Sequence, residues 1–173
     1  MKNVGPIRKE LGVKTFFNIL GPMVNPSFPK HQMVGVFSLE LARMYSYLYQ
    51  NTNTNFSILH GLDGFDEISL TDDVKIISNA SEAILKAEDF NLGKINLSQI
   101  QGGKTTDEAA SIFYDIISGK GTKAQNDVVC TNAAVAISTI NKLPYIENFD
   151  LAKETLKSGK ALEKLKKLQE LSR

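Results

Sequence analysis

The sequence contains few of the cysteine and histidine residues that stabilise secreted proteins and metal-binding folds. Its 173 residues include one cysteine, Cys130, and two histidines, His31 and His60. One cysteine cannot form a disulfide within the chain, and an unpaired thiol is typical of a reducing compartment. Two histidines do not make the ligand cluster of a zinc site. We therefore expect a cytoplasmic protein without disulfides or zinc.

Long hydrophobic runs and an excess of charge are also missing. No stretch approaches the roughly 18–20 apolar residues that a membrane helix needs. The charged opening MKNVGPIRKELGV does not fit the apolar run of an export signal. Basic and acidic residues number 20 and 19, for a net charge of +1, whereas nucleic-acid binding relies on a basic surface. These absences predict that the protein binds neither a membrane nor nucleic acid.

The apolar runs and turn residues of the first two thirds predict an α/β fold. Gln32–Phe37 and Asn55–Leu59 read as strands on either side of a helix over Ser38–Tyr49. This order is typical of a parallel crossover. Val74–Ser78 and Ala83–Lys86 predict a hairpin. We therefore expect a mixed, mostly parallel sheet flanked by helices.

From residue 105 onward the pattern predicts helices only. Thr105 and Glu108 match a capping box, in which each side chain satisfies a free amide of the first turn, and the helix is expected over Asp107–Ser118. The alanine-rich stretch from about Ala124 to Asn141 predicts a largely buried helix. Two amphipathic helices are expected after a break that Asn148 marks together with the preceding proline.

The predicted sheet is small for the parallel pairing that it contains. Parallel sheets are normally buried on both faces, and two or three strands leave an edge and a face without cover. The sequence therefore resembles part of a larger sheet. Within it we distinguish a loop-rich segment over 1–30, strands and a crossover helix over 31–104, and a helical segment over 105–173.

Three common phosphate-binding patterns fail on this sequence. GGKT at Gly102–Thr105 resembles the end of a P-loop, but Ser98 stands where that motif needs a glycine. The pair Asp72 and Asp73 lacks the small Thr-Gly residues of a diphosphate-sugar loop, so a turn between strands is favoured. No G-x-G-x-x-G follows a strand, which excludes the dinucleotide fingerprint.

The histidines and the cysteine are more readily explained by structure than by chemistry. His31 lies among prolines and is expected to be exposed. His60 ends a strand beside Gly61, where a ring satisfied by the backbone is commoner than a functional one, although a functional role stays open. Cys130 lies in the apolar run DVVCTNAAVAI and is expected to be an inert core residue.

Two segments carry the functional signal, GPIRKELGVKTFFNILGPMVNP over Gly5–Pro26 and HGLDGFDEISL over His60–Leu70. Together they resemble the anthranilate phosphoribosyltransferase family. Its members show an arginine-containing V-R-x-x-L-G-x-R-T segment running into F-N-I-L-G-P-L-x-N-P, and later H-G-x-x-G-x-D-E-x-S. The blocks VGVFSLELA, AEDFNLG, QGGKTTDEAA and VVCTNAAVAI also fall where the family places similar ones, so the resemblance covers nearly the whole chain.

This resemblance implies a nucleoside phosphorylase/phosphoribosyltransferase-like catalytic domain. The implied reaction transfers the phosphoribosyl group from phosphoribosyl diphosphate to anthranilate in tryptophan biosynthesis. Family members also carry G-T-G-G-D, N-x-S and K-H-G-x-R segments that cradle phosphoribosyl diphosphate, and this sequence contains none of them. We therefore expect a C-terminal portion of that domain, inactive alone and prone to self-association through uncovered apolar surface.

The resemblance assigns Arg8 to the carboxylate of anthranilate. A guanidinium offers paired donors that match carboxylate geometry, whereas without the resemblance Arg8 reads as a surface residue beside Lys9 and Glu10. Gly21 and Pro22 would form a rigid wall of the same substrate site, because proline fixes its own φ and glycine permits close approach. A plain turn is the alternative interpretation of this Gly-Pro pair.

Asp66 and Glu67 are the expected ligands of Mg²⁺. Hard oxygen donors suit this ion, which usually keeps waters and shares substrate phosphates. Adjacent residues of an ideal strand point to opposite faces, so either the Gly64 loop bends the backbone and both carboxylates serve one site, or the two carboxylates serve two ions. An exposed acidic turn is the alternative interpretation of the pair.

Two other functions remain as alternatives. One is a catalytically silent, nucleic-acid-binding relative of the same fold superfamily, against which the near-neutral charge and the presence of Arg8, Asp66 and Glu67 argue. The other is a pyrimidine nucleoside phosphorylase, which FNILGP and GFDEIS do not suit.

Overall fold

The computed structural model describes residues 21–172, and the chain divides into two units, Met1–Lys30 and His31–Arg173. The described part of the first unit contains one short 3₁₀ helix, η1 (Gly21–Val24). The elements described below belong to the second unit. Most of the loop-rich segment expected over 1–30 lies outside the described residues.

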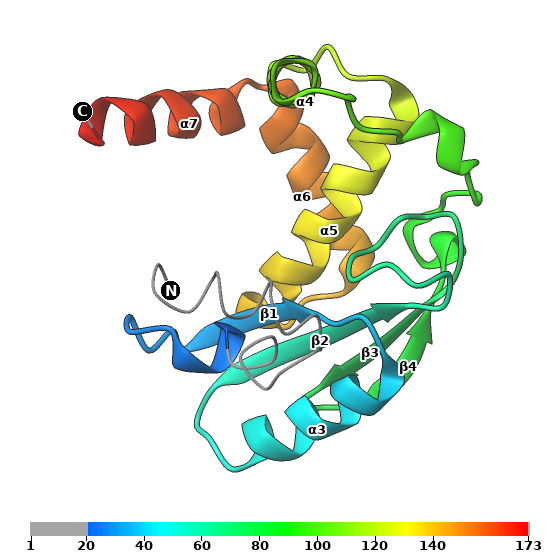
Figure 1. The fold of residues 1–173 in the computed structure, drawn as a ribbon, viewed down its shortest axis with the longest axis vertical. Helices are drawn as coiled ribbons and strands as arrows, with labels where there is room; N and C mark the ends of the chain where they lie inside the picture. The colour runs from blue at the N-terminus through cyan, green and yellow to red at the C-terminus, as the bar shows by residue number, and fades with distance from the viewer. Residues whose placement is uncertain (1–20, 173) are drawn as a thin grey trace, which may run out of the picture. The chain divides into compact units, whose positions relative to one another are not determined.

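A four-stranded mixed sheet forms the centre of the second unit (Figure 1). Its strands are β1 (His31–Gly35), β2 (Asn55–Gly61), β3 (Val74–Ser78) and β4 (Glu82–Leu85), and they follow one another in the order β1-β2-β3-β4. β1 and β2 are parallel, as the crossover pattern predicts. The β2–β3 and β3–β4 pairs are antiparallel, so within the described residues the parallel pairing is confined to the first two strands.

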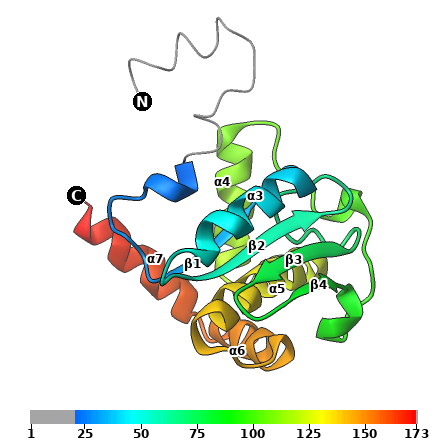
Figure 2. The same ribbon diagram turned by 90° about the horizontal axis from the view of Figure 1, so that it is seen from below.

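Helix α3 (Leu39–Gln50) makes the crossover and covers one face of the sheet (Figures 1 and 2). Ser38 caps it as predicted, because its hydroxyl accepts a hydrogen bond from the Leu41 amide at 3.3 Å. Its buried side includes Tyr49, whose ring stacks on Phe56 of β2 with centroids 5.3 Å apart. The apolar stripe of this helix therefore fixes which face of β2 it covers.

Helix α5 (Lys123–Asn141) packs on the opposite face and contacts β1 and β2. Ser57 of β2 bonds Thr139 of α5 through their hydroxyl oxygens at 2.8 Å, and both residues are buried. Helix α6 (Tyr145–Lys157) packs beside α5. The core between these elements is aliphatic and aromatic: Leu59, Ile68, Leu70, Val74, Ile76, Leu85, Phe90, Ala134, Val135, Phe149 and Leu156.

The remaining helices are shorter or less buried. They are η2 (Ala87–Phe90), η3 (Leu97–Gln99), α4 (Thr106–Ile117) and α7 (Lys160–Leu171), of which α7 packs against α6. In the described part of the chain, neither α4 nor α7 has a fully buried residue. None of the helices between residues 21 and 172 is long and apolar enough to cross a membrane.

Two local predictions are corrected in the helical region. Thr105 caps α4 by accepting from the Glu108 amide, but the Glu108 carboxylate accepts from the Lys104 amide at 2.6 Å, one residue before the expected partner. Asn148 does not mark a break: it lies inside α6, is 1% exposed, and donates to Ser138 Oγ at 2.7 Å. Its carboxamide is buried and links α6 to α5. From the sequence alone, this polar residue was interpreted as the sign of a loop.

Candidate functional site

The loop that leaves β2 carries the acidic pair predicted from the sequence. It begins with a tight turn in which the Gly61 amide donates to the Phe65 carbonyl at 2.8 Å and the Gly64 amide donates to the Gly61 carbonyl at 2.9 Å. Gly64 has φ of +97°, a conformation that side-chain-bearing residues rarely adopt. This turn bends the backbone away from the strand before Asp66, as a shared site for two adjacent carboxylates requires.

Asp66 and Glu67 are both exposed. Within residues 21–172 neither carboxylate has a hydrogen bond or an ion pair. Their oxygens are therefore available, within this range, to a cation or to solvent. The contacts that position the pair there are made by its backbone.

The Asp66 backbone lies directly on Gly35, the last residue of β1. A Cβ atom at Gly35 would lie 1.6 Å from the Asp66 carbonyl oxygen and 2.7 Å from its carbonyl carbon. These separations are far below van der Waals contact, so only glycine admits the loop at this position. The ends of the parallel strands β1 and β2 thus support the loop that carries Asp66 and Glu67.

The backbone after Glu67 is held by Asn132 of α5. The Ile68 amide donates to Asn132 Oδ1 at 3.0 Å, and Asn132 Nδ2 donates to the Ile68 carbonyl at 2.8 Å. The same Nδ2 donates to the Val128 carbonyl one turn earlier in α5 at 2.9 Å. One carboxamide therefore satisfies both backbone groups of Ile68, whose side chain is buried in the core.

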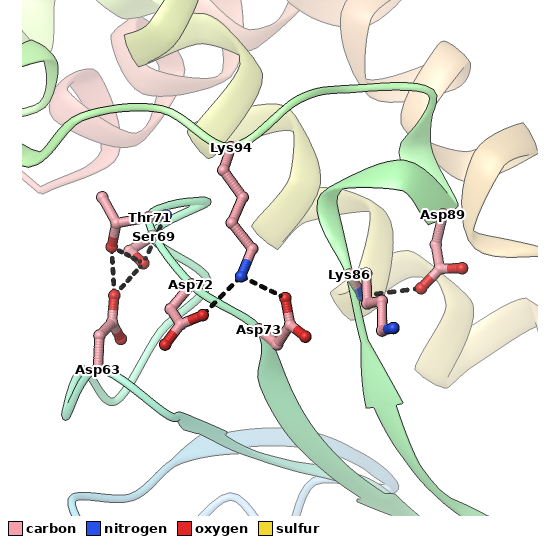
Figure 3. Close-up of polar contacts among 8 residues, drawn as sticks. All are labelled: Asp63, Ser69, Thr71, Asp72, Asp73, Lys86, Asp89 and Lys94. Atoms are coloured by element: carbon pink, nitrogen blue, oxygen red, sulfur yellow. Dashed lines mark hydrogen bonds and ion pairs between the residues drawn. The ribbon is translucent and has the colours of Figure 1, made fainter.

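A third acid of the loop, Asp63, has a different environment (Figure 3). Asp63 Oδ2 accepts hydrogen bonds from the hydroxyls of Ser69 and Thr71, and these two hydroxyl oxygens lie 2.6 Å apart. Leu70, between them, is buried with φ of +61°, so the network holds a left-handed residue. Asp63 closes the loop, whereas Asp66 and Glu67 project from it.

The loop ends at a charged cluster in which Lys94 meets two aspartates (Figure 3). Lys94 Nζ lies 2.6 Å from Asp72 Oδ1 and 2.8 Å from Asp73 Oδ1. Hydrogen bonding to Lys94 lowers the pKa of Asp72 below its ordinary value, and the two aspartates raise the pKa of Lys94. This cluster is the turn before β3 that the sequence predicted, rather than a diphosphate-sugar loop.

The histidines and the cysteine are structural, with one correction. His60 is buried, and its Nδ1 lies 2.8 Å from the Val36 carbonyl oxygen, as expected for a ring satisfied by the backbone. His31 is not fully exposed as predicted: it begins β1, and its Nδ1 lies 3.2 Å from Asn55 Nδ2. Cys130 is 2% exposed, and burial raises the pKa of its thiol to about 11. A thiol with this pKa stays protonated and inert near neutral pH.

The other predicted site residues divide between the described and the undescribed parts of the chain. Arg8 lies outside the described residues. Gly21 and Pro22 begin η1, in the first unit, which agrees with the expected turn. Their contact with a substrate remains a prediction.

The donor set of the loop suits Mg²⁺ better than a metal enclosed by the protein. Among the described residues no group of three or more histidine, cysteine, aspartate or glutamate side chains could hold a metal ion. Mg²⁺ usually takes only one or two carboxylates and completes its shell with waters and substrate phosphates. Asp66 and Glu67 fit that pattern.

Sequence reasoning missed two residues that position the acidic pair, Gly35 and Asn132. A glycine inside the apolar run QMVGVF is a signal for close backbone approach, although it does not name the partner. A carboxamide within the buried helix sequence CTNAAVA signals a polar group that needs a specific partner. Both signals are visible in the sequence, but their partners lie far along the chain.

Comparison with known proteins defines the class to which this architecture belongs. The family model described as "Glycosyl transferase family, a/b domain" matches residues 1–162. The chain therefore belongs to this glycosyl transferase family, and it shares the α/β fold of the family's solved members.

Within that family its relatives are anthranilate phosphoribosyltransferases, which confirms the resemblance seen in the sequence. The enzyme of Flavobacterium psychrophilum is 67% identical over 99% of this chain, and that of Bacteroides fragilis strain YCH46 is 47% identical over 99%. The anthranilate phosphoribosyltransferase structure from Thermus thermophilus superposes with a TM-score of 0.88 at 30% identity, covering 96% of this chain and 50% of that one. The Saccharomyces cerevisiae enzyme in complex with PRPP and Mg gives 0.86 at 28% identity, covering 96% and 48%. The chain spans about half the length of the curated relatives it matches.

Proposed function

We propose that this chain supplies part of an active site that transfers the phosphoribosyl group of phosphoribosyl diphosphate (PRPP) to anthranilate, the reaction that serves tryptophan biosynthesis in the cytoplasm. The observation that carries the proposal is the pair Asp66 and Glu67, two exposed carboxylates without protein partners among the described residues, on a loop held by its backbone. The names of the relatives support the substrates, since yeast enzyme structures contain PRPP with Mg or 4-fluoroanthranilate.

In this proposal Asp66 and Glu67 would hold the Mg²⁺ that the reaction uses with PRPP. When bound, Mg²⁺ offsets the negative charge that the departing diphosphate develops. The two carboxylates would provide the hard oxygen donors, and both are exposed on the loop that follows β2. Because their backbone is fixed in advance, little reorganisation is needed when the substrate arrives.

The nucleophile of the proposed reaction needs orientation more than deprotonation. Anthranilate attacks through an aromatic amine that is already neutral near pH 7, so no strong general base is required. Arg8 would bind the anthranilate carboxylate through its paired donors, and Gly21 with Pro22 would form a wall of the aromatic slot. Alignment of two reactants in this way supplies a large share of the barrier reduction.

A chimera tests the proposal directly. The 173 residues replace the matching 52% of the Flavobacterium psychrophilum enzyme, which is similar enough to accept them. We expect the chimera to consume anthranilate, followed by loss of its fluorescence, only when PRPP and Mg²⁺ are both present. The 173-residue chain alone, which carries no G-T-G-G-D segment, is the control expected to give no turnover.

Three substitutions in the chimera assign the carboxylates. Asp66→Asn and Glu67→Gln are each expected to lower the rate by about 100-fold, as for other groups that stabilise developing charge. Asp115→Asn removes an exposed carboxylate from α4 and should leave the rate unchanged. A chimera that is inactive while its parent is active, or full activity in both acidic-pair variants, would contradict the proposal.

A further inference from the structure

The side chains of Asp66 and Glu67 do not by themselves explain how the acidic pair is positioned. Two adjacent carboxylates repel each other, and within the described residues neither Asp66 nor Glu67 has a partner that would hold it. In this part of the chain, the contacts that position the pair are therefore those of the backbone. The two flanking contacts, at Gly35 and at Asn132, come from different elements of the second unit.

The contact at Asn132 is specific because one side chain makes every bond. Asn132 Oδ1 accepts from the Ile68 amide and Nδ2 donates to the Ile68 carbonyl, at 3.0 and 2.8 Å, so the carboxamide pairs with Ile68 as a neighbouring strand would. The additional bond from Nδ2 to Val128 fixes the carboxamide on its own helix. A change in the Asn132 rotamer would therefore break bonds to both Ile68 and Val128.

The contact between Asn132 and Ile68 also lies next to the acidic pair, where a movement of the backbone would displace the two carboxylates. Ile68 directly follows Glu67, and on the other side the Asp66 carbonyl rests on Gly35 with no room for a Cβ. The acidic pair is therefore held between the end of β1 and the middle of α5. Ser69 and Leu70, which come next, are buried, and the Ser69 hydroxyl donates to Asp63 within the loop. Asn132 therefore binds the backbone where the exposed acidic pair meets this buried stretch.

We propose that Asn132 is a positioning residue of the metal site: it fixes the Ile68 backbone so that the Asp66 and Glu67 carboxylates converge on one Mg²⁺. This inference rests on the proposed function, because it assumes that the pair binds Mg²⁺. Asn132 itself touches no substrate and no metal in this role. Partners of this kind affect metal affinity by about 10- to 100-fold when they are removed.

The first test follows the loop backbone, without using activity. In the 173-residue chain, amide hydrogen exchange at Ile68 should be slow, because its amide is bonded to Asn132. Asn132→Leu should accelerate exchange at Ile68, and Asn132→Asp, which keeps the acceptor and loses the donor, should have a smaller effect. The matched control is Asn126→Leu on the same helix, whose Nδ2 donates to the Gly121 carbonyl at 3.1 Å. It should leave Ile68 exchange unchanged.

The second test measures Mg²⁺ dependence in the chimera described above. Asn132→Leu should raise the Mg²⁺ concentration that gives half-maximal rate by about 10-fold or more, and excess Mg²⁺ should restore much of the rate. A merely structural loss would lower the rate at every Mg²⁺ concentration alike.

The outcomes separate the two proposals. An active chimera that needs Asp66 and Glu67 but has the same Mg²⁺ requirement with Asn132→Leu would overturn the inference and leave the proposed function intact. An inactive chimera would overturn the proposed function and the metal role of Asn132 with it. Unchanged exchange at Ile68 in Asn132→Leu would overturn the inference by itself.

Discussion

Gly35 shows how a single missing side chain determines the position of the acidic pair. The Asp66 carbonyl oxygen occupies the space where a Cβ atom of residue 35 would lie. Any other residue must push the loop away, although glycine weakens the strand in which it stands. The loss of strand stability is offset because the loop backbone can lie in direct contact with the strand.

We predict that Gly35→Ala destabilises the folded chain by about 1–3 kcal/mol, the usual cost of overpacking. Urea unfolding of the 173-residue chain measures this free energy. Gly102→Ala is the matched control, because a Cβ at Gly102 meets no atom within 4 Å. The control should stay within about 0.5 kcal/mol of the parent. Equal stabilities of the two variants would contradict the contact at Gly35.

At the residue scale, a short motif named the residues of the proposed site, and their metal role stays a prediction. GFDEIS singled out Asp66 and Glu67, and the structure places both on an exposed, bent loop. The roles of Gly35 and Asn132 were not predicted because their partners are far away in the sequence. The partner of Gly35 lies 31 residues later, and the partner of Asn132 lies 64 residues earlier. Periodicity and motif spacing report local order, so they do not identify contacts over such separations.

At the scale of elements, the cluster around Lys94 links the turn before β3 to the segment between η2 and η3 (Figure 3). A second link follows immediately, since the Ile95 amide donates to the Leu70 carbonyl at 3.0 Å. The segment that contains Lys94 is thereby fastened to the end of the acidic loop.

The pKa values of this cluster predict a pH window for its stabilising effect. The pKa of Asp72 is lowered from 3.8, so its contribution is complete above that pH and is lost as the pH falls through the lowered value. The pKa of Lys94 is raised from 10.5, so its contribution is complete below that pH and is lost only in strong alkali. The cluster therefore stabilises the fold between these two limits.

We predict that Lys94→Met lowers the melting temperature at pH 7, and that the difference from the parent is lost as the pH falls below 3.8 through the lowered pKa of Asp72. Because the groups are exposed, the difference should also shrink in high salt. Lys120→Met, which removes an exposed lysine that has no ion pair within residues 21–172, is the control. A difference that persists at low pH would point to a packing effect of the Lys94 side chain instead.

The helices and strands were the most predictable feature of this protein. The crossover helix, its Ser38 cap and the hairpin β3–β4 are confirmed because each depends on residues close in sequence. β2 continues to Gly61, two residues past the expected end, because its antiparallel partner β3 extends the pairing to Val74. Asn148 was misread because a buried polar residue in a helix looks like a break until its partner Ser138 is known.

At the scale of the whole molecule, the α/β class and the family were predictable and are confirmed. The arrangement of α4 was not. Its pattern predicted a helix, yet Phe113 and Tyr114 are 53% and 49% exposed and no residue of this helix is fully buried. A helix with an apolar side and no cover is an incomplete element of a core.

We predict that the 173-residue chain self-associates as its concentration rises. Among the described residues, the surfaces that favour it are the exposed aromatic residues of α4 and strand β1, which lies at the edge of the sheet. Sedimentation velocity should show growing weight-average mass, and the double substitution Phe113→Lys with Tyr114→Lys should reduce it. A single monomeric species over a hundredfold range of concentration would contradict this expectation.

The bond between Ile68 and Asn132 has a consequence for biosynthesis. During translation the acidic loop leaves the ribosome 64 residues ahead of the asparagine that secures it, several seconds earlier at about 5–20 residues per second. Throughout that interval the Ile68 backbone lacks the partner that α5 provides. On the proposed role of Asn132, the loop reaches its held geometry only when α5 emerges and docks on the sheet.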